Sequence, residues 1–195
     1  MNFQSLAFLP VILLGITSVF LLVSQNWRSS IAALAVQYLA VFWLVALVWP
    51  FGLAAVKLVA GWMAGAVLSA SRPREDIKDE ETPGFSGAFF RLIAAGLMLA
   101  LVFSTLPLAQ SHLSTTPRLL EGGMILIGLG LLHLGMSTRP LRVVIGLLTV
   151  LSGFELVYAG LETSILIAGL QAVVTLGLAL IGAYLLAVRE MEDSL

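Results

Sequence analysis

The chain has 195 residues, of which 59% are hydrophobic and 11% are charged, and its formal net charge is −1. A soluble domain has about 25% charged residues, so this composition predicts an integral membrane protein. It excludes a soluble enzyme, a nucleic-acid-binding protein and a disordered regulator. The chain contains no cysteine, which excludes disulfides and thiolate metal sites within it.

Seven apolar segments follow one another, and each is long enough for a membrane-spanning helix of about 20 residues. We expect spans near residues 6–24, 30–49, 51–70, 88–110, 119–137, 140–160 and 163–188, in a single all-α membrane domain over residues 1–195. No positive side chain precedes the first segment, which favours a retained helix over a signal peptide. Trp49-Pro50 predicts a tight hairpin with Trp49 at the membrane interface.

The basic residues predict the orientation of this bundle through the positive-inside rule. With the N-terminus outside, Arg118 alone faces outward and the C-terminus is cytoplasmic. The acidic loop 71–87 is then also cytoplasmic, either as a solvated linker or as a docking segment for a cytoplasmic partner. Eight basic residues face the cytoplasm: Arg28, Arg72, Arg74, Lys78, Arg91, Arg139, Arg142 and Arg189.

Two ionisable residues fall inside predicted spans, Lys57 in the third and Glu155 in the sixth. Intramembrane charge is costly and marks a functional candidate. Both residues lie roughly 8–9 Å below the outer boundary, a similar depth that permits a pair. Lys57, Gly61 and Gly65 share one helix face, and small residues at this spacing permit close packing. Lys57 is therefore expected to face protein.

The role of Lys57 stays open between two interpretations. Its amine can snorkel outward or form a purely structural ion pair. Alternatively it takes part in a proton path, because a buried lysine exchanges protons readily.

Polar residues in the seventh span form a second candidate group. Gln171 and Thr175 are four residues apart and share a face. They predict either hydrogen bonds between helices or the ordering of water along an ion path. His112 and His133 are expected on opposite sides of the membrane, which argues against a haem held by both. The sequence predicts no catalytic residues, no cofactor and no metal site.

Three stretches resemble component E of the hydrogenase-4 and formate-hydrogenlyase complexes. The C-terminal half is also similar to the K-type small subunit of respiratory complex I and to the C-type small subunit of Mrp-type cation/proton antiporters. The stretches are Leu47–Ala70, with Lys57 after a tight hairpin; Leu126–Gly146, with Arg139, Leu141 and the pair Ile145-Gly146; and Ala168–Leu186, with Gly177-Leu178-Ala179-Leu180.

This resemblance implies a non-catalytic subunit in the membrane arm of a complex-I-like or hydrogenase-4-like proton-translocating redox complex. It implies a bacterial or archaeal cytoplasmic membrane, with antiporter-like and other membrane subunits as partners, and redox centres that belong to partner chains. Lys57 and Glu155 would contribute to a proton or sodium path, and Gln171 and Thr175 would orient water.

The sequence departs from these families at two places. The complex I subunit carries an acid two residues after the Ile-Gly pair, and component E carries one a turn later; here these places are Leu148 and Leu151. Glu155 shares their helix face. Either the acid has moved one turn along this face, or Glu155 is unrelated to it. In the second case partner subunits supply the missing groups, or the chain keeps only a scaffold role.

Two other classes of function stay open: a free-standing small transporter or channel, and a purely structural subunit of another energy-transducing complex. Loss of pumping with intact assembly in Lys57→Ala would favour an ion path. Loss of assembly would favour a scaffold.

Overall fold

The computed structural model describes residues 7–71 and 85–193, with side chains over 7–71 and 87–188. The predicted loop 71–87 therefore lies mostly outside the described residues, as do the side chains of Arg72, Arg74, Lys78 and Arg189. Helix boundaries differ from the predicted spans by at most five residues. The described residues form seven helices: α2 (Phe8–Val23), α3 (Trp27–Ala46), α4 (Phe51–Ala70), α5 (Phe85–His112), α6 (Pro117–Gly135), α7 (Pro140–Leu161) and α8 (Ile165–Asp193).

Local sequence explains where several helices begin. The side chain of Asn26 accepts hydrogen bonds from the backbone N–H groups of Arg28 and Ser29, and so caps α3. Pro117 and Pro140 occupy the first turn of α6 and α7, where the missing N–H costs no hydrogen bond. α4 starts directly after Pro50. Most of the turns are therefore tight, and the helices that they join run antiparallel.

Six of these helices, α3 to α8, are long and apolar enough to cross a membrane. α2 has 16 residues and is thus about 24 Å long, shorter than a hydrocarbon core of about 30 Å. It nevertheless runs beside α3 and α6. The structure accordingly shows an all-helical protein with six helices of spanning length.

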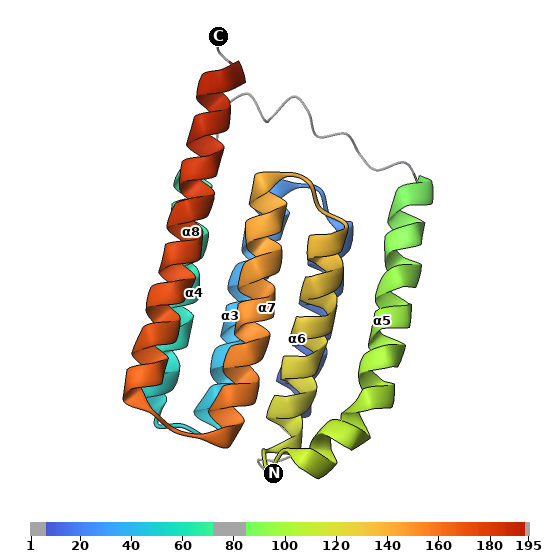
Figure 1. Ribbon diagram of the computed structural model, residues 1–195, viewed down its shortest axis with the longest axis vertical. Coiled ribbons are helices and arrows are strands. Elements are labelled where there is room, and N and C mark those ends of the chain that lie inside the picture. The colour runs from blue at the N-terminus through green and yellow to red at the C-terminus, as the bar shows by residue number, and fades with distance from the viewer. Residues whose placement is uncertain (1–6, 72–84, 194–195) are drawn as a thin grey trace.

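The helices form two facing layers (Figure 1). The first unit, α2 to α4, lies against the second unit, α6 to α8, so that α2 contacts α6, α3 contacts α7 and α4 contacts α8. Facing helices run in the same direction. The Arg118 guanidinium lies 5.4 Å from the Phe8 ring where α6 and α2 begin, and the Trp49 indole binds the carbonyl of Ala159 where α3 and α7 end.

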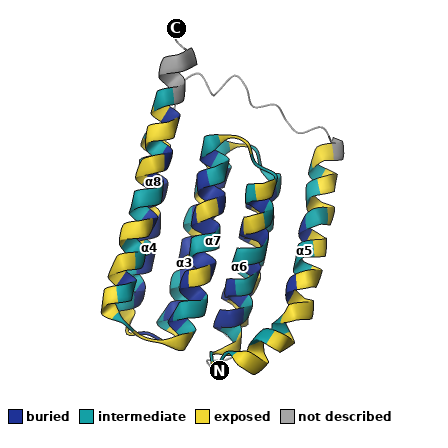
Figure 2. Cartoon of the chain, viewed as in Figure 1, coloured by how far each residue is buried: buried dark blue, intermediate teal, exposed yellow. Residues whose placement is uncertain are grey.

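α5 lies at one edge of the two layers, beside α6 and α2 (Figure 1). Pro107 stands inside this helix, and the ribbon bends near that end, as expected where a proline removes a backbone hydrogen bond. Among the helices of spanning length, α5 and α8 are the least buried: 11% and 22% of the residues in their most apolar segments are buried. The corresponding fraction is 56% in both α6 and α7 (Figure 2). The outer faces of α5 and α8 are therefore available to lipid or to partner chains.

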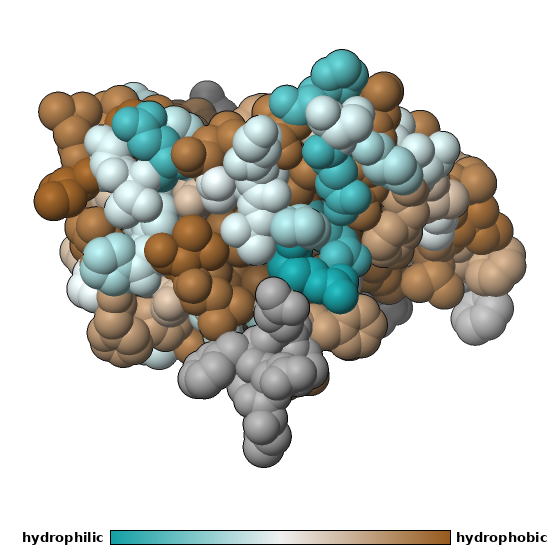
Figure 3. All heavy atoms as spheres, turned by 90° about the horizontal axis from the view of Figure 1, so that it is seen from below, coloured by the Kyte–Doolittle hydropathy of each residue, from teal (hydrophilic) through white to brown (hydrophobic). Residues whose placement is uncertain are grey.

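The two ends of the bundle differ in charge. The four described residues Arg28, Arg91, Arg139 and Arg142 lie at one end, hereafter the arginine end. Figure 3 shows the opposite end, where hydrophilic side chains spread across the bundle and hydrophobic ones form much of the rim. Arg118 is at this opposite end, with Nη1 2.8 Å from Glu121 Oε2.

Candidate functional site

Lys57 and Glu155 form an ion pair inside the bundle. Lys57 Nζ lies 3.3 Å from Glu155 Oε2, and the two side chains are 1% and 2% exposed. Lys57 is the seventh residue of α4, and Glu155 lies six residues before the end of α7, so both sit about 9 Å from that end of the bundle. The amine of Lys57 therefore does not snorkel to the surface. The two residues lie at a similar depth, as the sequence predicted, and they meet there.

The two polar residues predicted on α8 complete this cluster. Lys57 Nζ donates a hydrogen bond to Gln171 Oε1. The Thr175 hydroxyl lies 2.9 Å from the carbonyl of Gln171 and 3.4 Å from Glu155 Oε1, so its single proton can be given to only one of them at a time. All four residues that the sequence singled out thus meet between α4, α7 and α8. We call them the polar cluster.

Trp49 closes the polar cluster toward the nearer end of the bundle. Lys57 Nζ lies 5.9 Å from the centre of the indole ring, within the range of a cation–π contact. The indole Nε1 donates to the carbonyl of Ala159 at 3.0 Å. Trp49 is only 3% exposed, so its ring packs inside the bundle, in the turn between α3 and α4. The cation beside it and the carbonyl of α7 hold the ring inside.

Gly61 places Tyr38 beside the polar cluster. A Cβ at Gly61 would lie 2.1 Å from a ring carbon of Tyr38, so only glycine lets the ring rest on the backbone of α4. The Tyr38 hydroxyl is buried and has no hydrogen-bond partner among the described residues. It interacts with the Glu155 charge and lies near Ser152 and Thr175.

Buried polar groups continue from the cluster toward the arginine end. Gln37 Nε2 donates to Thr149 Oγ1 at 3.3 Å, and Ser152 donates to the carbonyl of Leu148 at 2.8 Å. His133 is 3% exposed and interacts with the charges of Arg91 and Arg142. From Glu155 to Arg142 is a distance of about 20 Å along α7. We call this series, from Tyr38 and Ser152 through Gln37 and Thr149 to His133, the polar file.

Several atoms near this route are incompletely bonded. Gln37 Oε1, Tyr38 Oη and His133 Nε2 are buried with no hydrogen-bond partner among the described residues. Buried polar atoms ordinarily have such partners. These atoms are therefore the positions at which water or a moving proton would be bound most favourably.

Leu148 and Leu151, the two places where the families that the sequence resembles carry an acid, lie in apolar surroundings or are partly exposed. Leu148 is fully buried and packs in a cluster with Tyr38, Leu34 and Ile145. Leu151 is partly buried. Glu155 is the buried carboxylate of α7 and lies farther along this helix. Among the described residues no group of three or more His, Cys, Asp or Glu side chains could hold a metal ion.

Comparison of the chain with protein-family models, with curated proteins and with solved structures finds no match. The resemblance to component E stays a prediction from the sequence.

Proposed function

We propose that this chain is a non-catalytic subunit of a redox-linked, proton-translocating membrane complex, and that the polar cluster is a charged relay point in its proton path. The observation that carries the proposal is the buried Lys57–Glu155 pair. An ion pair within membrane-spanning helices is costly compared with apolar packing, and such residues commonly serve ion movement.

The polar file supports a route to this relay point from one side. Its side chains and the unpartnered atoms among them are spread between the cluster and the arginine end, where bound water would complete a route. On the other side, Trp49 stands between the cluster and the nearer end of the bundle. A gate there, or a group from a partner subunit, would complete the path.

The resemblance to component E suggests the partners: antiporter-like and other membrane subunits of a complex whose redox centres would belong to partner chains. The weakly buried faces of α5 and α8 provide surface for them. In this proposal α2 is a seventh, short span. The arginine end then faces the cytoplasm of a bacterium or archaeon, the N-terminus lies outside and the C-terminus inside, as the positive-inside rule predicts.

The decisive variant removes both charges at once. Lys57→Met or Glu155→Leu alone leaves an uncompensated buried charge and should destabilise the protein by about 3–5 kcal/mol. The double variant Lys57→Met/Glu155→Leu should regain most of that stability, because apolar groups replace a buried pair well. A matched control, Arg118→Gln/Glu121→Gln, removes the ion pair at the end of the bundle, where Arg118 is 42% exposed.

Proton uptake by inverted membrane vesicles from the native host measures function, and co-purification with mass spectrometry measures assembly. We expect the double variant to assemble but to lose substrate-driven proton uptake, while the control keeps both. A double variant that assembles and translocates protons at the wild-type rate would show that the pair is structural. Proton conduction by the purified chain alone in liposomes would instead identify a free-standing transporter.

A further inference from the structure

Three arginines line one small cavity at the arginine end. Arg91 from α5, Arg139 from the α6–α7 turn and Arg142 from the start of α7 surround about 80 Å³ together with Gln25 and Ser137. Convergent guanidinium groups bind phosphate oxygens through paired, charge-assisted hydrogen bonds. The cavity therefore has the chemistry of an anion site.

Hydrogen bonds hold Arg142 in place within this cavity. Its Nη1 donates to the carbonyl of Ser24 and its Nη2 to that of Leu22, both at 2.9 Å. Arg142 Nε and Ser137 Oγ are buried and have no hydrogen-bond partner among the described residues. Two residues that line the cavity thus each keep one buried donor that no described residue bonds.

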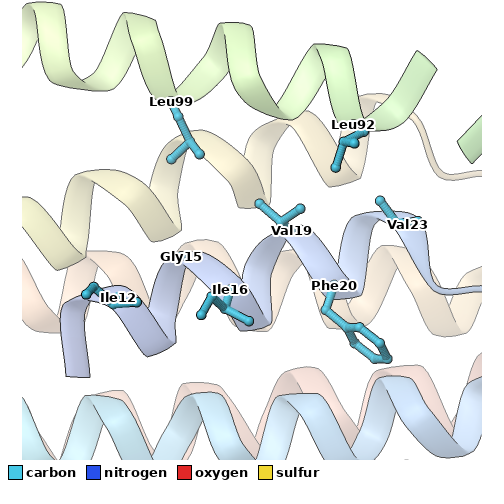
Figure 4. Close-up of a pocket in the computed structure, with 8 residues that line it drawn as sticks. All are labelled: Ile12, Gly15, Ile16, Val19, Phe20, Val23, Leu92 and Leu99. Atoms are coloured by element: carbon cyan, nitrogen blue, oxygen red, sulfur yellow. The ribbon is translucent and has the colours of Figure 1, made fainter. Parts of the chain in front are cut away.

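The structure also has an apolar groove, and two of its lining residues, Val23 and Leu92, lie close in sequence to Gln25 and Arg91 of the cavity. It has a volume of about 540 Å³ and lies between α2 and α5, with Ile12, Ile16, Val19 and Leu99 among its lining residues. In Figure 4, Leu92 and Leu99 point from α5 toward α2, and Val19 points toward α5.

Lining residues of the groove and of the cavity are neighbours along α5. Leu92 lines the groove, whereas Arg91 lines the cavity and donates to the carbonyl of Leu22 at 3.4 Å. A molecule lying along α2 would therefore pass from an apolar surface directly to the guanidinium groups.

We propose that the cavity and the groove together bind one anionic phospholipid, with its phosphate on the arginines and an acyl chain between α2 and α5. Charge and shape select this occupant. An apolar helix of a partner would fill the groove but bring no anion to the arginines, and free phosphate would leave the groove empty. Basic pockets beside spanning helices are suited to anionic headgroups.

Native mass spectrometry of the delipidated full chain in detergent tests this proposal. The probes are phosphatidylglycerol, phosphatidylcholine and inorganic phosphate. We expect one phosphatidylglycerol to bind, in preference to phosphatidylcholine, and an excess of inorganic phosphate to leave it bound. Arg91→Gln and Arg139→Gln should each weaken binding about fivefold. Arg28→Gln, an exposed arginine at the same end, is the matched control.

A second variant tests the acyl chain separately. Gly15 lines the groove, and a Cβ there would meet no atom within 4 Å, so Gly15→Leu fills the groove without straining the helix. We expect it to weaken phosphatidylglycerol binding severalfold. Gly169→Leu, at an exposed position on α8 where a Cβ also meets nothing, should not.

Two results would overturn the proposal. One is equal binding of both lipids, together with equal lipid binding by Arg139→Gln and Arg28→Gln. Arg139 lies in an exposed turn, so Arg139→Gln is expected to fold even if Arg91→Gln does not. The other is displacement of the lipid by inorganic phosphate with no effect of Gly15→Leu, which would identify a site for free phosphate.

Discussion

At the scale of single residues, the polar cluster depends on a close fit between Tyr38 and Gly61. Lys57 and Glu155 could be placed from the sequence because a charge inside an apolar run is conspicuous, and their distance from the helix ends indicates a shared depth. The shared helix face of Gln171 and Thr175 could be predicted from their four-residue spacing. The positions of Tyr38 and Trp49 could not be predicted, because they depend on which helices lie side by side.

Gly61→Ala should disturb this fit. The new Cβ would lie 2.1–2.5 Å from three carbons of the Tyr38 ring, and a buried ring has little room to move. We expect a loss of about 1–3 kcal/mol in the free energy of unfolding, measured by thermal unfolding in detergent.

Gly65→Ala is the matched control for this substitution. It lies one turn along the same helix, and its nearest contact would be 3.8 Å away. The control should be neutral or slightly stabilising, because alanine favours helix over glycine. Equal stability of the two variants would contradict the proposed role of Gly61.

At the scale of helices, α6 and α7 approach each other most closely at glycines. A Cβ at Gly153 would lie 2.7 Å from the carbonyl oxygen of Gly123, and one at Gly130 would lie 2.9 Å from the backbone nitrogen of Val150. Gly123 and Gly130 are seven residues apart, as are Gly146 and Gly153. The sequence contains this signal on both helices, but glycines are frequent in the chain and the pattern alone does not indicate which helices pair.

Gly153→Ala should force these two helices apart, since the clash is with backbone and no side-chain rotation relieves it. We expect destabilisation of about 1–3 kcal/mol or more, and weaker helix contact reported by cross-linking between α6 and α7. Gly135→Ala, where a Cβ on α6 meets no atom within 4 Å, should keep both properties. A Gly153→Ala variant as stable as Gly135→Ala would refute this account of the packing.

At the scale of the whole molecule, two three-helix units face each other in the same order and direction, and the polar cluster lies between them. No repeat between the two parts is evident in the sequence, because apolar residues substitute for one another within each helix. Hydropathy located the seven helices to within five residues. That α4 lies against α8, and α3 against α7, could be seen only in the structure.

The proposed orientation can be measured directly because the chain has no cysteine of its own. Single cysteines at Ser114, in the α5–α6 turn, and at Thr138, in the α6–α7 turn, mark the two ends. A membrane-impermeant maleimide should label Ser114→Cys in intact cells, whereas Thr138→Cys should react only after permeabilisation. The reverse pattern would show that the arginine end faces outward.

The separation of the ion pair along the chain also has a consequence for biosynthesis. Glu155 follows Lys57 by 98 residues, and a ribosome adds about 5–20 residues per second. α4 is therefore complete for roughly 5–20 s before its counter-charge is made. During that interval its ammonium group has no carboxylate from α7, and hydrocarbon accepts such a charge poorly. We therefore expect the nascent chain to keep α4 in a wet or protein-lined place until α7 is made, and its insertion to depend on a membrane insertase.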